Sequence, residues 1–238
     1  MISFIIPAYN EERLLARTLG ALHVAAQAVG EPYEVIVADD ASTDGTAAIA
    51  AKHSARLVRV AHRQIAATRN AGAREANGDF LFFVDADTLV NERALHGAIQ
   101  ALRDGAVGGG TAIHFDGRLP PYARLLQPLF VWFCRLARLT GGCFLFCTRQ
   151  AFQTVGGFDE ALYGAEEIVM CGALKRQGQF VVLREAVVTS GRKLRAYSGW
   201  EVLRIMGRLG LRGPKSVRGR RGLEMWYGER REDPESPT

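Results

Sequence analysis

The chain has 238 residues, of which 48% are hydrophobic and 23% are charged. This length suits one domain with an appendage, and this composition is typical of a globular protein with a substantial core. Together they exclude a disordered chain, a collagen-like repeat and a small disulfide-stapled protein.

Charge is distributed unevenly along the chain. Residues 184–231 hold 13 Lys and Arg against 4 acidic residues, whereas residues 1–183 hold 17 basic and 18 acidic residues. Glu232, Asp233 and Glu235 then form an acidic tip. A basic C-terminal segment of this kind favours an anionic partner, such as lipid head groups, nucleic acid or a phosphorylated substrate.

The sequence contains no recognisable secretory signal, because it opens on a strand-like run at 2–7 rather than on a basic region. The longest uncharged apolar run, 128–134, is far shorter than the ~20 residues of a membrane-spanning helix. The cysteines show no paired CxxC spacing: they are Cys134, Cys143, Cys147 and Cys171. We therefore expect reduced core thiols in a cytoplasmic protein.

The first hundred residues alternate between strand-like and helix-like hydrophobic periods. The pattern predicts strands at 3–7, 34–38, 57–60 and 80–84, and helices at 14–22, 43–52, 65–76 and 94–102. Continuous apolar strands that alternate with helices indicate a mostly parallel sheet with helices on both faces. We therefore predict an α/β fold.

The regular alternation stops after about residue 105. Apolar residues from Tyr122 to Leu136 share one helical face, which we interpret as core or as part of an acceptor groove, and Pro128 is expected to kink or break this helix. The remaining predicted elements are a strand through 113, a strand at 144–147, a helix at 166–177 and two strands near 180–189. We find no internal repeat and no low-complexity linker.

Polar clusters follow the first, second and fourth predicted strands, at 7–12, 39–46 and 85–88. In an open parallel sheet, ligands bind beyond the carboxyl ends of the strands, so the three clusters are expected to converge. The convergence brings together four carboxylates, those of Asp39, Asp40, Asp85 and Asp87. Such carboxylates repel one another unless a cation or a hydrogen-bonding ligand compensates them. The alternative for any single aspartate is that it caps the turn or helix that follows.

The Asp-x-Asp formed by Asp85 and Asp87 suits a hard divalent cation that bridges phosphate oxygens. The chain has no G-x-x-x-x-G-K-[ST] motif and no G-x-G-x-x-G that opens a helix after a strand. A P-loop site and a Rossmann cofactor site are therefore unsupported.

The order of these motifs resembles glycosyltransferase family 2. The motifs are Pro-Ala-Tyr-Asn-Glu at 7–11, Asp-Asp-Ala-Ser-Thr-Asp-Gly-Thr at 39–46, Arg-Asn-Ala-Gly at 69–72, Gly-Asp at 78–79, Asp-Ala-Asp at 85–87, Gly-Gly-Phe-Asp-Glu at 156–160 and Glu-Glu at 166–167. The resemblance spans about residues 1–190 and implies a GT-A fold. It divides the chain into a donor half over 1–104, an acceptor and catalytic half over 105–190, and a basic extension over 191–238.

The resemblance implies a pocket for a nucleotide-diphosphate sugar. The residues that would line it are Pro7, Tyr9, Glu11, Asp39, Asp40, Arg69 and Asp85. Asp40 would accept a hydrogen bond from the base, and Arg69 would lie near the base or the diphosphate. Asp87, with Asp85, would hold Mn²⁺ or Mg²⁺, which neutralises charge on the leaving nucleoside diphosphate.

The resemblance also implies inverting catalysis by a carboxylate at the start of the helix at 166–177. Glu167 stands where the family usually has Asp and would be the base, and Glu166 takes the role if the helix is shifted by one residue. The alternative is that both glutamates only stabilise the helix N-terminus.

Many relatives add a late His as a metal ligand, but this chain has Val-Thr-Ser-Gly-Arg-Lys at 188–193 and no His after His114. Either water or the diphosphate then completes the coordination of the metal, or Arg192 and Lys193 take over part of the charge neutralisation.

Residues 198–212 form a basic amphipathic pattern. Trp200, Leu203, Met206 and Leu209 share one helical face, and Arg204, Arg208 and Arg212 share another. Such a helix suits an anionic membrane surface, which we predict to contact residues 198–221. The protein would then be cytoplasmic or peripheral on the inner face of the membrane. The alternative is a helix packed on the domain with solvated arginines.

The resemblance therefore implies a metal-assisted inverting glycosyltransferase that moves a sugar to a hydroxyl or phosphate acceptor; the acceptor is not identified, and a lipid-linked or cell-envelope molecule is one candidate. One alternative is a sugar-phosphate nucleotidyltransferase, but the Gly-rich signature expected after the first strand is missing. Another is a catalytically impaired relative that binds a nucleotide sugar or a membrane surface. A nucleic-acid partner is not expected, because base-reading and base-stacking motifs are absent.

Overall fold

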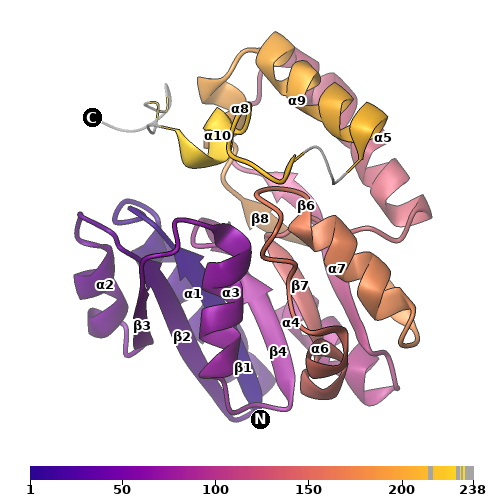
Figure 1. The fold of residues 1–238 in the computed structure, drawn as a ribbon. Helices are drawn as coiled ribbons and strands as arrows, with labels where there is room; N and C mark the ends of the chain where they lie inside the picture. The colour runs from indigo at the N-terminus through magenta and orange to yellow at the C-terminus, as the bar shows by residue number, and fades with distance from the viewer. Residues whose placement is uncertain (214–216, 229–230, 232, 234–238) are drawn as a thin grey trace.

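The computed structural model describes residues 1–213, 217–228, 231 and 233, except for the side chains at 130, 206 and 208–212. Within this part of the chain, eight strands form one sheet in the order β3-β2-β1-β4-β7-β6-β8-β5 (Figure 1). The strands are β1 (Ile2–Ala8), β2 (Tyr33–Asp40), β3 (Arg56–Val60), β4 (Phe80–Val84), β5 (Thr88–Leu89), β6 (Gly108–Phe115), β7 (Phe144–Thr148) and β8 (Phe180–Thr189).

The sheet is parallel in its first half and mixed in its second. Strands β3, β2, β1 and β4 all run parallel. Strand β7 is antiparallel to both β4 and β6, β6 is parallel to β8, and the short β5 is antiparallel to β8. The predicted α/β class is confirmed, and the antiparallel strands all lie at or beyond β7.

Helices cover both faces of the sheet, as the continuous apolar strands predicted. They are α1 (Leu15–Val29), α2 (Thr46–Lys52), α3 (Ile65–Arg74), α4 (Glu92–Arg103), α5 (Pro121–Leu136), α6 (Arg149–Val155), α7 (Glu166–Lys175), α8 (Arg192–Ala196), α9 (Gly199–Arg212) and α10 (Glu224–Tyr227). Side chains alternate along a strand, so Phe4 and Ile6 of β1 pack with α1 and α4, whereas Ile5 packs with α3, α6 and α7. Two separate cores therefore hold the strands in place.

The structure differs from the predicted elements in a few places. Residues 180–189 form one strand, β8, rather than two. Helices α6, α8 and α10 and strand β5 were not predicted, and each has seven residues or fewer. Elements this short carry too few periodic positions for a hydrophobic pattern to reveal them.

Helix α5 differs most from its prediction. It continues through Pro128. A proline has no N–H to donate to the carbonyl four residues earlier, which here belongs to Arg124. Both residues are exposed, so water can bond to this carbonyl. The interpretation of its apolar face as core is wrong. Large apolar side chains of α5 are exposed to solvent: Leu125, Leu126, Leu129, Trp132, Phe133 and Leu136.

The C-terminal segment returns over the loop that precedes α7. Val217 and Leu223 are buried in a small cluster with Leu162 and Ala165, and the backbone N–H of Tyr163 donates to the carbonyl oxygen of Val217 at 2.7 Å. In Figure 1 this segment passes above the upper ends of the strands. Among the described residues, no helix combines the length and the apolar character needed to cross a membrane.

Candidate functional site

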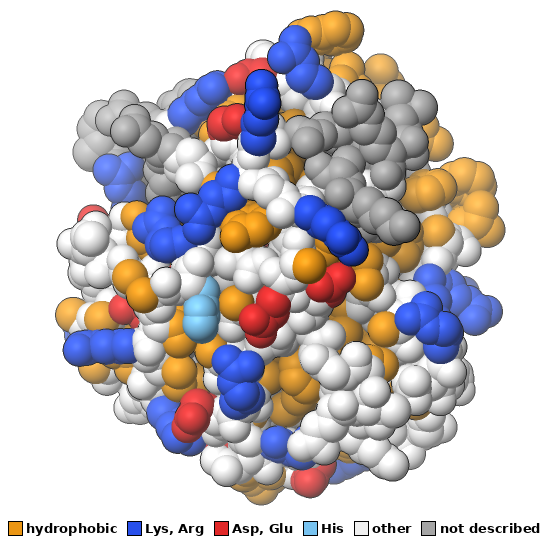
Figure 2. Space-filling model, in the orientation of Figure 1, with side chains coloured by type: hydrophobic (Ala, Val, Ile, Leu, Met, Phe, Trp, Pro, Cys, Tyr) orange, Lys and Arg blue, Asp and Glu red, His pale blue; other side chains and the backbone are white. Residues whose placement is uncertain are grey.

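The three predicted polar clusters meet at the carboxyl edge of the sheet. Strand β1 lies between β2 and β4, and Ala8 is paired with Asp39 at the end of the ladder. The backbone N–H of Asn10 donates to Ser42 Oγ at 2.9 Å, and that of Glu11 donates to Thr46 Oγ1 at 2.7 Å. These hydrogen bonds fasten the loop after β1 to the loop after β2. Figure 2 shows acidic side chains near the centre of this face, with Lys and Arg side chains around them.

Arg192, at the start of α8, lies between two of the predicted site carboxylates. Its Nη2 is 2.7 Å from Glu11 Oε1 and 3.0 Å from Asp87 Oδ2. Thr189 Oγ1 donates to the other oxygen, Asp87 Oδ1, at 3.3 Å. Burial works against the charged guanidinium, but Asp87 and Glu11 outweigh it and raise the pKa of Arg192. Arg192 is thus a fixed positive charge on the predicted metal ligand.

Arg69, from α3, links the donor half to α7. Its side chain is only 3% exposed, and its Nη2 is 2.9 Å from Asp85 Oδ1 while its Nη1 is 2.8 Å from Glu166 Oε1. The same Nη2 donates to the carbonyl oxygen of Gly142 at 3.1 Å. The guanidinium therefore fixes the distance between Asp85 and the predicted catalytic helix.

Asp85 and Asp87 provide oxygen donors of the kind that a divalent cation prefers. Burial raises the pKa of Asp85, and repulsion from Asp87 adds to this, while Arg69 opposes it. A hard cation would relieve that repulsion, so the donor set of these two carboxylates fits Mn²⁺ or Mg²⁺. Among the described residues, no group of three or more His, Cys, Asp or Glu side chains is placed to hold a metal.

The two glutamates at the start of α7 have different surroundings. Glu166 is buried and is paired with Arg69. Burial, together with repulsion from Glu166, raises the pKa of Glu167 to about 8, although Arg69 acts against it. A carboxylate with a raised pKa can take a proton near neutral pH, whereas Glu166 is already committed to its ion pair. Both also lie in the first turn of α7, where acidic residues stabilise a helix.

Asp40 caps the start of α3. Its Oδ1 accepts from the backbone N–H of Arg63 at 2.7 Å, and its Oδ2 accepts from that of Gln64 at 3.0 Å and from Thr68 Oγ1 at 2.9 Å. Its neighbour Asp39 accepts from the backbone N–H of Ser42 at 3.2 Å through Oδ1. The role that the sequence left open for single aspartates, capping the turn that follows, is therefore present at Asp39, whereas Asp40 holds the start of a later helix.

Tyr9 follows β1 directly, after the half-buried Pro7, and faces a residue that the sequence did not single out. The guanidinium carbon of Arg63 lies 3.4 Å from the centroid of the Tyr9 ring. Arg63 has a left-handed backbone with φ of 51°, just before α3 begins. No spacing rule points to Arg63 or to Thr189, because both reach the site through tertiary packing of short loops and strand ends.

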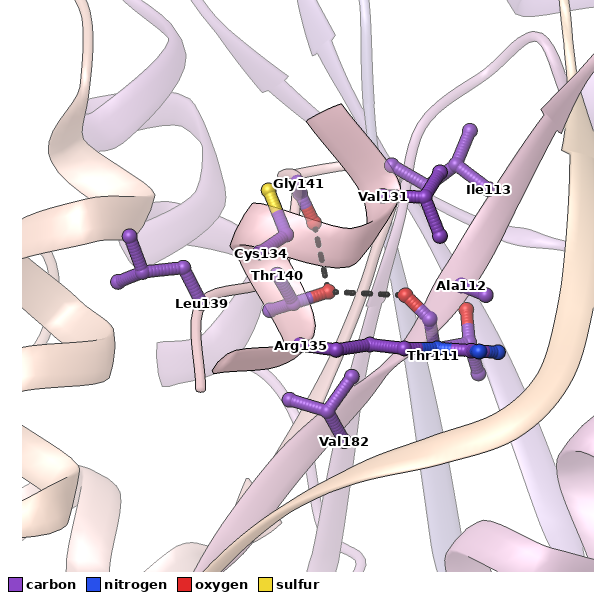
Figure 3. Close-up of a pocket in the computed structure, with 10 residues that line it drawn as sticks. All are labelled: Thr111, Ala112, Ile113, Val131, Cys134, Arg135, Leu139, Thr140, Gly141 and Val182. Atoms are coloured by element: carbon purple, nitrogen blue, oxygen red, sulfur yellow. Dashed lines mark hydrogen bonds between the residues drawn. The ribbon is translucent and has the colours of Figure 1, made fainter. Parts of the chain in front are cut away.

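A small cavity lies under α5, between this helix and strands β6 and β8 (Figure 3). Its walls include Val131, Cys134 and Val182, and Thr140 Oγ1 on its rim donates to the carbonyl oxygens of Thr111 and Gly141. Its volume is about 20 Å³, which is room for about one water molecule. It is too small for a nucleotide.

Comparison with known proteins places the chain among sugar-transferring proteins. The model of the family "Glycosyl transferase family 2" matches residues 3–152. Validoxylamine A glucosyltransferase of Streptomyces hygroscopicus subsp. jinggangensis is 35% identical over 107 residues, which is 42% of this chain and 25% of that protein. The poly(ribitol-phosphate) beta-N-acetylglucosaminyltransferase TarS of Staphylococcus aureus is 33% identical over 102 residues, covering 40% of this chain and 18% of that protein. The matched region is thus a quarter or less of each of these relatives.

Solved structures share the fold over most of the chain. The mannosyltransferase PcManGT from Pyrobaculum calidifontis, in complex with GDP-Man and Mn²⁺, has a TM-score of 0.68 at 22% identity, covering 88% of this chain and 61% of that one. Residues 1–349 of TarS from S. aureus, in complex with UDP-GlcNAc, have a TM-score of 0.61 at 23% identity, covering 80% of this chain and 58% of that one. The motifs, the α/β architecture and the matched family model agree, and the chain belongs to glycosyltransferase family 2.

Proposed function

We propose that this protein transfers a sugar from a nucleoside-diphosphate sugar to an acceptor hydroxyl or phosphate, with inversion at the anomeric carbon. The observation that carries the proposal is that Asp85 and Asp87 lie at one edge of the sheet beside the start of α7, where Arg69 joins Asp85 to Glu166, the neighbour of Glu167. Residues 1–104 would bind the donor and residues 105–190 the acceptor. The bound GDP-Man and UDP-GlcNAc of two structural neighbours support a sugar-nucleotide donor.

The nucleotide would lie over the loops that follow β1 and β2. Tyr9, Pro7 and Glu11 would line this pocket, with Arg63 and Tyr9 offering flat surfaces for the base. Asp40 already accepts three hydrogen bonds, whereas one is described for Asp39. A carboxylate can accept about four, so Asp39 keeps more capacity for an N–H of the base than Asp40 does.

Asp87 and Asp85 would hold a divalent cation, and the bound Mn²⁺ of PcManGT supports this assignment. Such a cation supplies neutralising charge for the leaving diphosphate. Arg69 pairs with Asp85 and Arg192 pairs with Asp87, and among the described residues these are the only positive charges that form ion pairs with the two carboxylates. Arg192 is less buried than Arg69, with 19% of its side chain exposed, so it can also bind a diphosphate oxygen.

Glu167 would act as the general base. It removes the proton from the acceptor hydroxyl, whose oxygen forms the new bond to the anomeric carbon. The bond from that carbon to the diphosphate oxygen breaks on the opposite side, and the nucleoside diphosphate leaves with the electron pair. Glu166 would hold Arg69 in place and, through it, Asp85.

The acceptor class remains a proposal that rests on the C-terminal helix. In α9, Trp200, Leu203 and Arg204 are exposed, as expected for a helix that contacts an anionic membrane. The side chains of Met206, Arg208, Leu209 and Arg212, which complete the predicted pattern, lie outside the described residues. A membrane position for α9 would favour a lipid-linked or cell-envelope acceptor.

Calorimetric titration with UDP, GDP, dTDP and CDP, each with and without Mn²⁺, tests the proposal. We expect one nucleotide to bind tightly only with Mn²⁺, and the Asp87→Asn variant to lose this dependence. Asp79→Asn is the control, because the Asp79 side chain is 80% exposed and its ion pair is with the amino group of Met1. If no nucleotide binds, the transferase proposal is wrong. If one binds but no sugar nucleotide is ever turned over, the chain is an impaired relative.

A further inference from the structure

Helix α5 presents an apolar face to solvent. Leu125, Leu129, Trp132 and Leu136 recur at helical spacing, and their exposed fractions are 79%, 61%, 60% and 70%. Leu126 and Phe133 flank this stripe with 40% and 54%. A stripe of this kind on a helix is normally buried against another element. An exposed apolar surface of this extent therefore indicates a binding face.

Helix α9 extends the same face. At its start, a Cβ added to Gly199 would come within 3.0 Å of the Tyr122 ring at the start of α5. Tyr122 Oη donates to the carbonyl oxygen of Leu194 at 2.9 Å, so α8 is tied to α5 as well. Figure 1 shows α5 and α9 side by side, and hydrophobic side chains lie over them at the edge of the view in Figure 2.

The α5–α9 face consists of the exposed apolar residues of both helices: Leu125, Leu126, Leu129, Trp132, Phe133, Leu136, Trp200 and Leu203. Its rim is basic. Helix α5 contains no acidic residue, while Arg124, Arg135 and Arg138 in or after it and Arg204 in α9 are exposed. Glu201, the acidic residue of α9, is neutralised by Arg231, whose Nη2 lies 2.9 Å from its Oε1.

The composition of the face identifies what covers it. A second copy of the chain in a two-fold arrangement would place the arginine rim against itself, and like charges at an interface are unfavourable. Anionic phospholipid matches both the apolar stripe and the basic rim, because the leucines can be buried among acyl chains while the arginines pair with phosphates. Trp132 and Trp200 are 60% and 72% exposed, and tryptophan favours the membrane–water interface.

We infer that the α5–α9 face inserts shallowly into an anionic phospholipid surface, with α5 as its principal apolar contact. Both helices would lie in the plane of the interface. Helix α8 connects this surface to the sheet edge, because its Leu194 carbonyl accepts from Tyr122 while its Arg192 contacts Asp87. If the proposed function is correct, a lipid-borne acceptor would enter beside the catalytic groups. The membrane contact itself does not require that function.

Flotation with vesicles of phosphatidylcholine alone, or of phosphatidylcholine mixed with phosphatidylglycerol, tests this inference. We expect the protein to float with the mixed vesicles and to stay behind with the neutral ones. The double variant Leu129→Gln, Trp132→Gln should reduce binding at least tenfold. The matched control is Val24→Gln, which removes an apolar side chain that is 68% exposed on α1 and should change nothing.

Two further measurements separate the membrane from other occupants. On a Trp226→Phe background, Trp132 and Trp200 are the remaining tryptophans, and their emission should shift to the blue on addition of mixed vesicles. The Arg124→Gln, Arg138→Gln variant should lose the preference for phosphatidylglycerol. Nucleotide binding by calorimetry should be unchanged in every variant, so a failure of the transferase proposal remains distinguishable from a failure of this one.

Three outcomes would overturn the inference. The first is no binding of the wild-type protein to mixed vesicles. The second is equal loss of binding in the Val24→Gln control and the double variant. The third is a dimer in light scattering that the double variant converts to monomer, which would assign the face to a second copy of the chain.

Discussion

Two regions of the molecule expose different kinds of side chain. The loops after β1, β2 and β4 carry charged side chains, whereas helices α5 and α9 carry exposed apolar ones. At the loops, charged side chains are held in specific contacts: Asp40 caps α3, Arg69 of α3 bridges Asp85 and Glu166, and Arg192 of α8 bridges Glu11 and Asp87. In the helices, six large apolar side chains of α5 are 40% to 79% exposed in the described chain. The first region is thus built around charge, and the second is built for contact with something outside it.

This difference shows where binding energy can come from. A preorganised set of charges binds a small anionic ligand with little reorganisation. An uncovered apolar helix face gains its energy only when a large surface removes it from water. Changes to the two regions should therefore separate donor chemistry from surface binding.

The broadest effect, on both donor binding and turnover, is expected at Asp87. Asp87→Asn removes one of two predicted carboxylate ligands and also the partner of Arg192, so turnover should fall by at least about a hundredfold. Donor binding should become insensitive to Mn²⁺ in calorimetry, while flotation with anionic vesicles should not change. Metal-dependent binding that survives in Asp87→Asn would remove this residue from the metal role.

Glu167→Gln should separate binding from chemistry. The amide cannot accept the acceptor's proton, so kcat should fall by about 10²–10⁴-fold while donor affinity stays nearly constant. Glu185→Gln is the control, because Glu185 is an exposed residue of β8. Steady-state kinetics with the donor chosen by calorimetry gives both values. Full activity in Glu167→Gln would move the base to Glu166 or elsewhere.

Arg192→Gln should have opposite effects on metal and nucleotide. Without the guanidinium, Asp87 loses a competing positive charge, so Mn²⁺ alone should bind more tightly. The nucleoside diphosphate should bind about ten- to a hundredfold more weakly, because one charge-assisted hydrogen bond contributes about 1.5–3 kcal/mol. Electron paramagnetic resonance of free Mn²⁺, with and without nucleotide, measures both effects. Unchanged Mn²⁺ binding would show that Arg192 does not compete for Asp87.

Much of the donor half could be predicted because its signals are local. Each buried strand is a continuous apolar run, and each polar cluster follows a strand directly, so parallel pairing alone brings Asp39, Asp85 and Tyr9 to one edge. Glu166 and Glu167 were also placed correctly at the start of a helix. The resemblance to the family added roles for these residues but was not needed for their convergence.

The remaining features depend on contacts that no local pattern encodes. The sequence pattern of the apolar stripe of α5 is the same whether the stripe is buried in a core or exposed to solvent. Which of the two occurs depends on the elements that pack beside the helix. The contact of Arg63 with Tyr9 arises from a left-handed residue before α3. Arg192 was considered for charge neutralisation, but its bridge between Glu11 and Asp87 needs the short helix α8, which the sequence pattern did not reveal.

The last expected effect concerns stability rather than activity, and it is a pH-dependent gain of stability in Glu167→Gln. The pKa of Glu167 is raised from 4.5 to about 8 in the folded protein, chiefly by burial. Between these values the folded chain holds a proton that the unfolded chain has lost, so the free energy of unfolding of the wild type falls as pH rises. The slope is at most about 1.4 kcal/mol per pH unit, and it ends above about pH 8.

Because the glutamine stays neutral at every pH, the free energy of unfolding of the variant does not fall with pH for this reason. Urea unfolding of Glu167→Gln and of the wild type at pH 5, 6, 7 and 8 should therefore show a difference that widens with pH in favour of the variant. The exposed Glu185→Gln change should give no such trend, because its carboxylate remains in water. A constant difference between Glu167→Gln and the wild type would mean that Glu167 is ionised in the folded protein throughout this pH range, and that its surroundings at the start of α7 do not raise its pKa.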